Sequence, residues 1–140
     1  MNNHSYVELH VPSFDTAKDF YGKLGFKAAR EQKSDDPRKN YLVMALGNNI
    51  LCFWPGNDQV YTQSYFKNFP AGTKRGYGVE TVIQVDNLEE AYKAAQNLGC
   101  VVGELTTKHW GKKDFRIEDP FGYYLRFTEP YNILDPTLGV

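Results

Sequence analysis

Acidic, basic and aromatic side chains alternate with apolar ones in short segments of this sequence, and they could together form a site. Glu8 and His10 share one face of a segment that alternates like a β-strand, and Glu80 lies in a similar later segment. A carboxylate beside a histidine could support a general base, and carboxylates with histidines could hold a metal ion. Arg126 lies among aromatic residues in another such segment, where a cation needs a carboxylate partner or solvent.

The segment that contains Arg126 predicts a β-hairpin. Residues 112–118 and 123–129 alternate between aromatic or aliphatic and polar side chains, as half-buried strands do. Between them, Pro120 fixes φ for a turn and Gly122 tolerates a left-handed conformation. Arg126 is therefore expected in the middle of a strand.

An internal repeat predicts the elements that position these residues. Residues 7–26 align without a gap on residues 81–100, at an offset of 74. Each copy has a strand-like segment, an amphipathic helix pattern and a glycine where the helix should end. The same offset carries Leu51 onto Leu125 in the closing strands. The repeat predicts an α+β fold of two β-α-β-β-β modules in tandem.

The repeat also sets the expected organisation of one domain over residues 1–140. The expected parts are module 1 at about 5–54, a connection at about 55–78, module 2 at about 79–129 and a tail at 130–140, with helices near 14–24 and 88–98 and a partly helical stretch at 60–68.

Strand alternation predicts which side chains share a face. Leu9 and Val11 match the apolar set that packs on the helix, so Glu8 and His10 face the other way. The same alternation in the other strands gives a helix-free face with these residues: Tyr6, Glu8, His10, Cys52, Trp54, Glu80, Gln84, Tyr124 and Arg126. This face is either solvated surface or the wall of a binding cleft, and the alternation leaves both open.

Composition limits the classes of function. The 140 residues are 41% hydrophobic and carry a net charge of −1, so there is no electrostatic reason to bind nucleic acid or an anionic membrane. Two cysteines, Cys52 and Cys100, argue against a disulfide framework. No leader segment and no membrane-spanning run is evident, so we expect a cytoplasmic protein.

Two stretches resemble a known superfamily. DTAKDFYGKLGF at the first helix and WGKKDFRIEDPFGYYLRF near the C-terminus, together with the repeat, resemble the glyoxalase, bleomycin-resistance and extradiol-dioxygenase superfamily of the vicinal oxygen chelate fold. The resemblance covers about residues 5–129. The Trp-Gly run and the segment LCFWPGNDQ look like the bleomycin-resistance branch. The resemblance implies a cleft lined by both modules and, in that branch, a homodimer.

The resemblance also identifies the positions that would bind a metal. In metal-dependent members the first and last strands of each module supply the ligands, and the matching positions here are Tyr6, Cys52, Glu80 and Arg126. Only Glu80 is an ordinary ligand, and Arg126 places a permanent cation where the metal charge would lie. We therefore expect no metal and no other cofactor, with Arg126 paired to Glu80 or Glu8. The alternative is that Arg126 makes only a structural ion pair.

Tryptophans are the best candidates for contact with a ligand. Trp54 and Trp110 could stack on planar rings, and Trp110 matches the Trp of the family's Trp-Gly element, although it could instead pack at a subunit interface. Tyr61, Tyr65 and Phe66 could cover the cleft or meet a second subunit. The predicted ligand-binding residues are Tyr6, Glu8, His10, Cys52, Trp54, Glu80, Trp110, Tyr124 and Arg126.

Three functions fit these observations. The first is a metal-free, non-enzymatic protein that sequesters an aromatic or cationic small molecule in a cleft at the interface of a homodimer, with a possible role in antibiotic resistance. The second is a metal-dependent lyase, isomerase or dioxygenase of the same superfamily. The third is an interaction module that uses the old cleft for a protein partner. Because one fold hosts many activities, the three functions have to be distinguished by the residues of the site.

Overall fold

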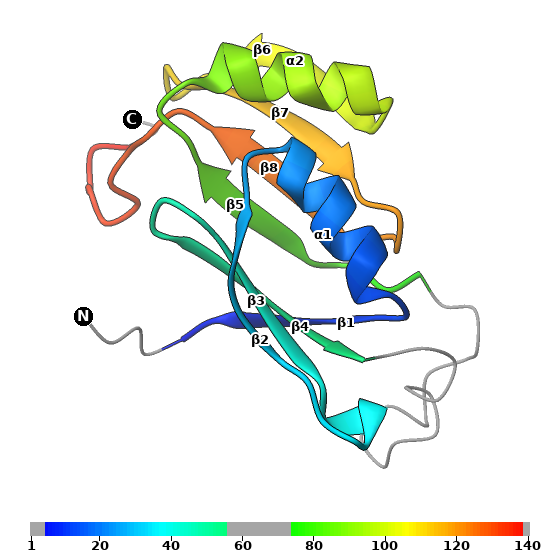
Figure 1. Cartoon of the computed structure of the whole chain (residues 1–140). Helices are drawn as coiled ribbons and strands as arrows, with labels where there is room; N and C mark the ends of the chain where they lie inside the picture. Colours follow the sequence, from blue (N-terminus) through cyan, green and yellow to red (C-terminus); the bar gives the residue numbers. More distant parts are fainter. Residues whose placement is uncertain (1–4, 56–73, 139–140) are drawn as a thin grey trace. The chain divides into compact units, whose positions relative to one another are not determined.

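The computed structural model describes residues 5–55 and 74–138, in a chain that divides into two compact units, unit 1 (residues 1–73) and unit 2 (residues 74–140). Each unit has the element order β-α-β-β-β that the repeat predicts, apart from a short 3₁₀ turn in unit 1. The predicted α+β class is confirmed (Figure 1).

Unit 1 is a four-stranded mixed sheet with one helix. Its elements are β1 (Val7–Val11), α1 (Phe14–Lys23), β2 (Lys27–Gln32), the 3₁₀ turn η1 (Pro37–Lys39), β3 (Tyr41–Leu46) and β4 (Asn49–Pro55). The strand order is β1-β4-β3-β2, with β1 parallel to β4 and the other pairs antiparallel. The first and last strands of the unit are therefore hydrogen-bonded neighbours.

Unit 2 repeats this topology. Its elements are β5 (Glu80–Gln84), α2 (Leu88–Leu98), β6 (Val101–Thr107), β7 (Lys113–Glu118) and β8 (Tyr124–Thr128). The order is β5-β8-β7-β6, and β5 runs parallel to β8. This order brings β5, β8 and β7 side by side, which decides the contacts of Arg126 described below.

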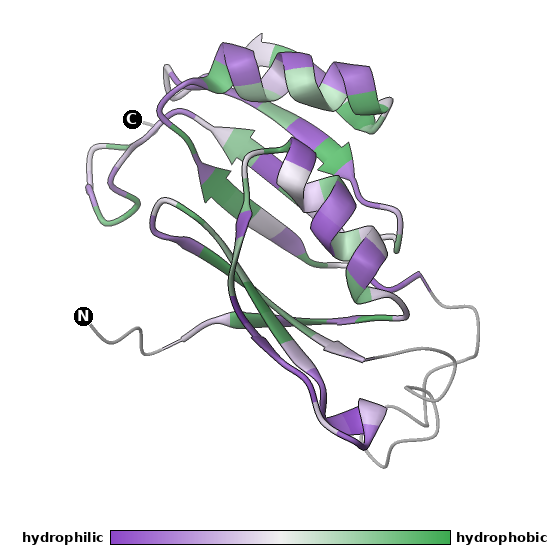
Figure 2. Ribbon diagram, in the orientation of Figure 1, coloured by the Kyte–Doolittle hydropathy of each residue, from purple (hydrophilic) through white to green (hydrophobic). Residues whose placement is uncertain are grey.

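Local sequence signals account for both helices. The side chain of Ser13 caps α1 by accepting from the backbone N–H of Thr16, and Asn87 caps α2 in the same way. Gly25 and Gly99 have φ of 99° and 68°, a left-handed conformation that lets the chain leave each helix. The helix predicted near 88–98 matches α2, and α1 ends one residue before the predicted bound. Figure 2 shows hydrophobic and hydrophilic residues interspersed along both helices.

Aromatic packing identifies the face of each sheet that lies under its helix. In unit 1 the rings of Tyr21 on α1 and Phe53 on β4 lie 5.3 Å apart. In unit 2 Tyr92 on α2 contacts Phe115 on β7, and Phe115 stacks on Phe127 of β8 at 5.2 Å. Because successive side chains on a strand alternate, the neighbours of Phe115 and Phe127 point away from α2. The predicted helix-free face is confirmed for unit 2.

The predicted turn between the closing strands is also confirmed. Both the Phe121 and the Tyr123 backbone N–H groups donate to Oδ1 of the buried Asp119, and Gly122 has a φ of 97°. After β8 the Tyr131 N–H donates to the side chain of Gln84 at 3.0 Å, so the tail is held against β5. No helix in the described residues is long and apolar enough to cross a membrane.

The helical stretch predicted at 60–68, with Tyr61, Tyr65 and Phe66, lies outside the described residues.

Candidate functional site

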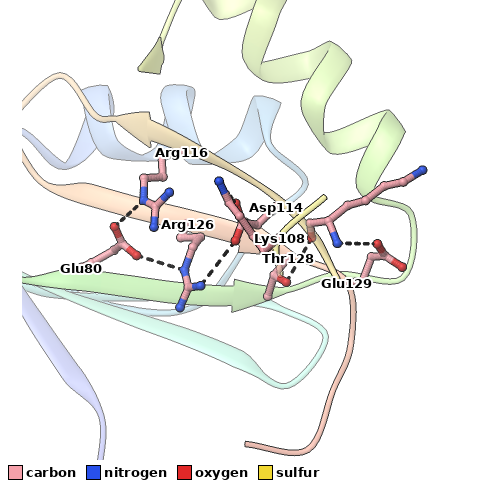
Figure 3. Close-up of polar contacts among 8 residues, drawn as sticks. Glu80, Lys108, Asp114, Arg116, Arg126, Thr128 and Glu129 are labelled. Atoms are coloured by element: carbon pink, nitrogen blue, oxygen red, sulfur yellow. Dashed lines mark hydrogen bonds and ion pairs between the residues drawn. The ribbon is translucent and has the colours of Figure 1, made fainter. Parts of the chain in front are cut away.

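Two arginines lie directly opposite each other on the helix-free face of unit 2. Arg116 on β7 is the register partner of Arg126 on β8. Like charges at opposed positions repel, so this pairing requires a compensating anion. Glu80 on β5 supplies it. Nε of Arg116 donates to Oε2 of Glu80 at 2.8 Å, and Nε of Arg126 lies 3.0 Å from Oε1 (Figure 3).

A second carboxylate lies on the other side of Arg126. The side chain of Asp114 on β7 is only 1% exposed, and its Oδ2 accepts from Nη1 of Arg126 at 3.4 Å. Nζ of Lys108 lies 3.5 Å from Oδ1. A buried carboxylate needs such partners, because removal from water without them is costly. We call the five residues Glu80, Lys108, Asp114, Arg116 and Arg126 the arginine–carboxylate cluster.

Trp110 lies beside this cluster, in the turn between β6 and β7. Gly111 permits the turn with a φ of 85°, and the Gly111 N–H donates to the Lys108 carbonyl at 2.9 Å. Cζ of Arg126 lies 5.8 Å from the centroid of the Trp110 ring, within the range of a cation–π contact. Arg126 was predicted to pair with Glu80 or Glu8, and the pairing is confirmed for Glu80.

The same face carries one further ion pair. Lys74 contacts Glu118 of β7, and its Nζ lies 5.0 Å from the centroid of the Tyr124 ring. The hydrogen bond to Glu118 raises the pKa of Lys74, so this cation stays charged at neutral pH. The pair is balanced, and it adds no net charge to the face.

The helix-free face of unit 1 centres on Glu8 and Tyr41. The Tyr41 hydroxyl donates to Oε2 of Glu8 at 2.6 Å. Burial, together with hydrogen bonds to Glu8 and Cys52, raises the pKa of Tyr41, so the phenol keeps its proton at neutral pH. Cys52 is buried in β4, as expected for a small apolar side chain.

The remaining predicted residues of unit 1 lie near this pair or at its edge. His10 and Trp54 are register partners in the parallel strands β1 and β4, and their rings lie 5.0 Å apart. Tyr6 precedes β1 and is exposed. Within unit 1, Glu8, His10, Cys52 and Trp54 thus lie on two paired strands.

The positions that the family uses for metal ligands do not form a metal site in either unit. In unit 2, Glu80 is occupied by two guanidinium groups, and Arg126 has no lone pair to donate. In unit 1 the matching residues are an exposed phenol, Tyr6, and a buried thiol, Cys52. Across residues 5–55 and 74–138, no group of three or more His, Cys, Asp and Glu side chains could hold a metal ion. The donors present do not fit a divalent metal.

The sequence did not predict four residues of the two units: Asp114, Arg116 and Lys108 in the arginine–carboxylate cluster, and Tyr41 beside Glu8. Asp114 and Arg116 have the same strand parity as Arg126, and the hairpin register would have placed them beside it. Tyr41 and Lys108 gave no such signal. Tyr41 reaches Glu8 across β4, and Lys108 depends on the conformation of a turn.

We predict that replacement of Arg126 by Met lowers the free energy of unfolding by about 2–4 kcal/mol. The substitution removes a largely buried cation, so Asp114 and Glu80 each lose one partner. The second substitution Asp114→Asn should then cost less than it does in the wild type. Urea unfolding of the two single variants and the double variant measures this coupling.

The matched control for this cycle is Arg38→Met. Arg38 pairs with Asp36 on the surface of unit 1, and its loss should leave the unfolding midpoint unchanged within error. Strictly additive effects of Arg126→Met and Asp114→Asn would contradict the pairing.

The second prediction concerns pH. The folded-state pKa of Tyr41 is raised above the unfolded value of about 10, so its stabilising contribution is complete below that pH and is lost as the pH rises through it. Tyr41→Phe should therefore have a lower melting temperature than the wild type at pH 8, and the difference between the two melting temperatures (the gap) should shrink by pH 11. The exposed Tyr77 provides the control Tyr77→Phe, which should show no gap at either pH. A gap that stays constant would mean that the Tyr41 proton does not contribute.

Comparisons with known proteins agree with the geometry. The family model of the Glyoxalase/Bleomycin resistance protein/Dioxygenase superfamily matches residues 4–127, whereas no curated protein sequence matches the chain. Among solved structures, TioX from Micromonospora sp. ML1 is 19% identical with a TM-score of 0.66, over 94% of this chain and 99% of that one. A bleomycin resistance determinant encoded on transposon Tn5 is 18% identical with a TM-score of 0.64, over 94% and 100%.

A bleomycin-binding protein in complex with bleomycin is 17% identical with a TM-score of 0.62, over 93% of this chain and 100% of that one. At these identities the structures show a shared fold alone, the α+β vicinal oxygen chelate fold of two tandem modules. The family match covers most of the chain and agrees with the duplicated topology. The chain belongs to the Glyoxalase/Bleomycin resistance protein/Dioxygenase superfamily.

Proposed function

We propose that this protein binds an aromatic small molecule without a metal ion and sequesters it rather than converting it. The observation that carries the proposal is the position of Arg126. It is the residue that matches a metal ligand of the superfamily, and it is ion-paired to Glu80, the residue at a second such position. The cation needed to balance Glu80 is therefore a side chain of the protein itself.

Trp110 supports the aromatic part of the proposal. Its indole is only partly buried and contacts the Arg126 guanidinium on one side. A planar ring that stacks on the indole would gain the contact energy typical of aromatic pairs. Of the two ligand classes expected from the sequence, the cationic one is less favoured, because Glu80 is already neutralised by two guanidinium groups.

Relatives in the same superfamily are consistent with sequestration. Two solved structures of the same fold are described as a bleomycin resistance determinant and a bleomycin-binding protein. From these descriptions we carry over only the general property, binding of a small molecule. We propose a homodimer because of the resemblance to the bleomycin-resistance branch, and a cytoplasmic location because two cysteines argue against a disulfide framework. Sedimentation as a monomer at tens of micromolar would contradict the homodimer.

The alternative of a metal-dependent lyase, isomerase or dioxygenase requires three or more protein ligands around one metal ion. Among the positions that match metal ligands, Glu80 is the one carboxylate, and each of its two oxygens contacts an arginine. The donor set thus favours the binding protein over the enzyme.

The experiment is calorimetric titration of the wild type with naphthalene-2-carboxamide, an uncharged planar probe, in buffer with and without EDTA. We expect saturable binding that EDTA leaves unchanged. Trp110→Leu should weaken it about tenfold, the value of roughly one aromatic stacking contact. Cyclohexanecarboxamide, which is not planar, should bind more weakly than the aromatic probe.

Two outcomes would contradict the proposed function. One is binding that appears only after addition of Ni²⁺, Zn²⁺, Mn²⁺ or Fe²⁺, together with a stoichiometric metal in the purified protein. The other is equal affinity of wild type and Trp110→Leu for the planar probe.

A further inference from the structure

We propose that the arginine–carboxylate cluster binds an anionic group, a carboxylate or a phosphate, so that the ligand of this protein is an aromatic anion. The aromatic part rests on the proposed function above, and the anionic part rests on the cluster alone. Three features of the cluster carry the inference: its charge balance, its free donors and its exposure.

The charge balance of the cluster is positive. Lys108, Arg116 and Arg126 supply three cations, whereas Glu80 and Asp114 supply two carboxylates. Among the described residues no other carboxylate lies within 4.0 Å of the three cations. The hydrogen bond to Glu80 raises the already high pKa of Arg116, so that cation is permanent. One positive charge is left over for a ligand.

The adjacent ion pair does not absorb this excess. Glu118 follows Arg116 by two residues on β7 and faces the same side, but Lys74 neutralises it. The face of unit 2 formed by these residues is therefore positive overall at neutral pH.

The two arginines retain donors that point to bidentate recognition. A guanidinium group carries five N–H donors in a planar fork. Arg116 donates from Nε to Glu80, and Arg126 donates from Nη1 to Asp114, whereas Nε of Arg126 lies 3.0 Å from Glu80 as an ion pair without hydrogen-bond geometry. In the part of the chain that the structure describes, the terminal nitrogens of Arg116 and Nη2 of Arg126 have no acceptor. The fork–fork geometry of arginine with carboxylate or phosphate is a strong and specific interaction.

Strand register brings these donors together. Arg116 and Arg126 are opposed across an antiparallel pair, where Cβ atoms lie about 5 Å apart. Glu80 already bridges the two groups with one oxygen to each, as Figure 3 shows. The two guanidinium groups therefore lie close enough to share one carboxylate, and an incoming anion would engage the donors that remain.

Exposure separates the residues that anchor the cluster from those that meet the ligand. The side chains of Asp114 and Arg126 are 1% and 16% exposed, whereas those of Arg116 and Lys108 are 38% and 28% exposed. We assign Arg116 and Lys108 to direct contact with the anion. Arg126, held by both carboxylates, lies against Trp110 and links the anion to the ring.

The test compares three planar probes that differ in one substituent: naphthalene-2-carboxylate, naphthalene-2-carboxamide and 2-naphthylmethylammonium. Calorimetric titration at low and physiological salt gives the affinities, with inorganic phosphate as a probe without a ring. We expect the carboxylate to bind about tenfold or more tighter than the amide, since its hydrogen bonds with the guanidinium groups are charged on both sides. The preference should decrease as salt increases.

Arg116→Gln should abolish the preference for the carboxylate over the amide. Arg116→Lys keeps the charge without the fork and should retain part of the preference. Arg38→Gln, at an exposed ion pair of unit 1, is the matched control and should change nothing. Melting curves of each variant verify folding.

Each outcome distinguishes this inference from the proposed function. Equal affinity for carboxylate and amide, or tighter binding of the ammonium, would overturn the anion site and leave the aromatic function standing. Saturable phosphate binding that is lost in Arg116→Gln, with no binding of any naphthalene probe, would support the anion site and contradict the aromatic function. Failure of every probe to bind would overturn both.

Discussion

The carboxylate of Glu80 sits between the guanidinium groups of Arg116 and Arg126, with one oxygen toward each. Sheet topology imposes this arrangement. The strand order places β8 between β5 and β7, so the central Arg126 has an arginine on one side and a glutamate on the other. Without Glu80, two opposed cations would repel across a strand pair. Asp114 holds the outer end of Arg126, and Trp110 lies against its guanidinium.

The ion pair between Glu80 and Arg126 joins the first and last strands of unit 2. The first and last strands of each unit are hydrogen-bonded neighbours, so the positions that hold ligands in metal-dependent relatives are brought together by topology. In unit 2 these positions carry a carboxylate and an arginine that satisfy one another. In the proposed function, the positive charge beside Glu80 belongs to Arg126, so it is covalently part of the chain and cannot dissociate.

The fold was accessible to sequence reasoning because its signals are local or repeated. The strand alternation, the amphipathic helix patterns, the glycines after both helices and the 74-residue offset each indicated the same elements. The contact of Arg126 with Glu80 followed from parity and the family positions. The rest of the cluster depends on cross-strand register and turn conformation. Asp114 and Arg116 could have been placed from the hairpin register, whereas Lys108 follows the irregular pairing of β6 and depends on a turn conformation that a single sequence does not show.

The most direct test of the account is the melting temperature of Arg126→Glu with and without Mn²⁺ or Ni²⁺. If Arg126 replaces a metal, this variant places a carboxylate next to Glu80 and should melt well below the wild type when metal-free. Added metal should then restore part of the loss, whereas Arg126→Met, which gains no ligand, should not respond. An Arg126→Glu variant that is as stable as the wild type and indifferent to metal would contradict the account.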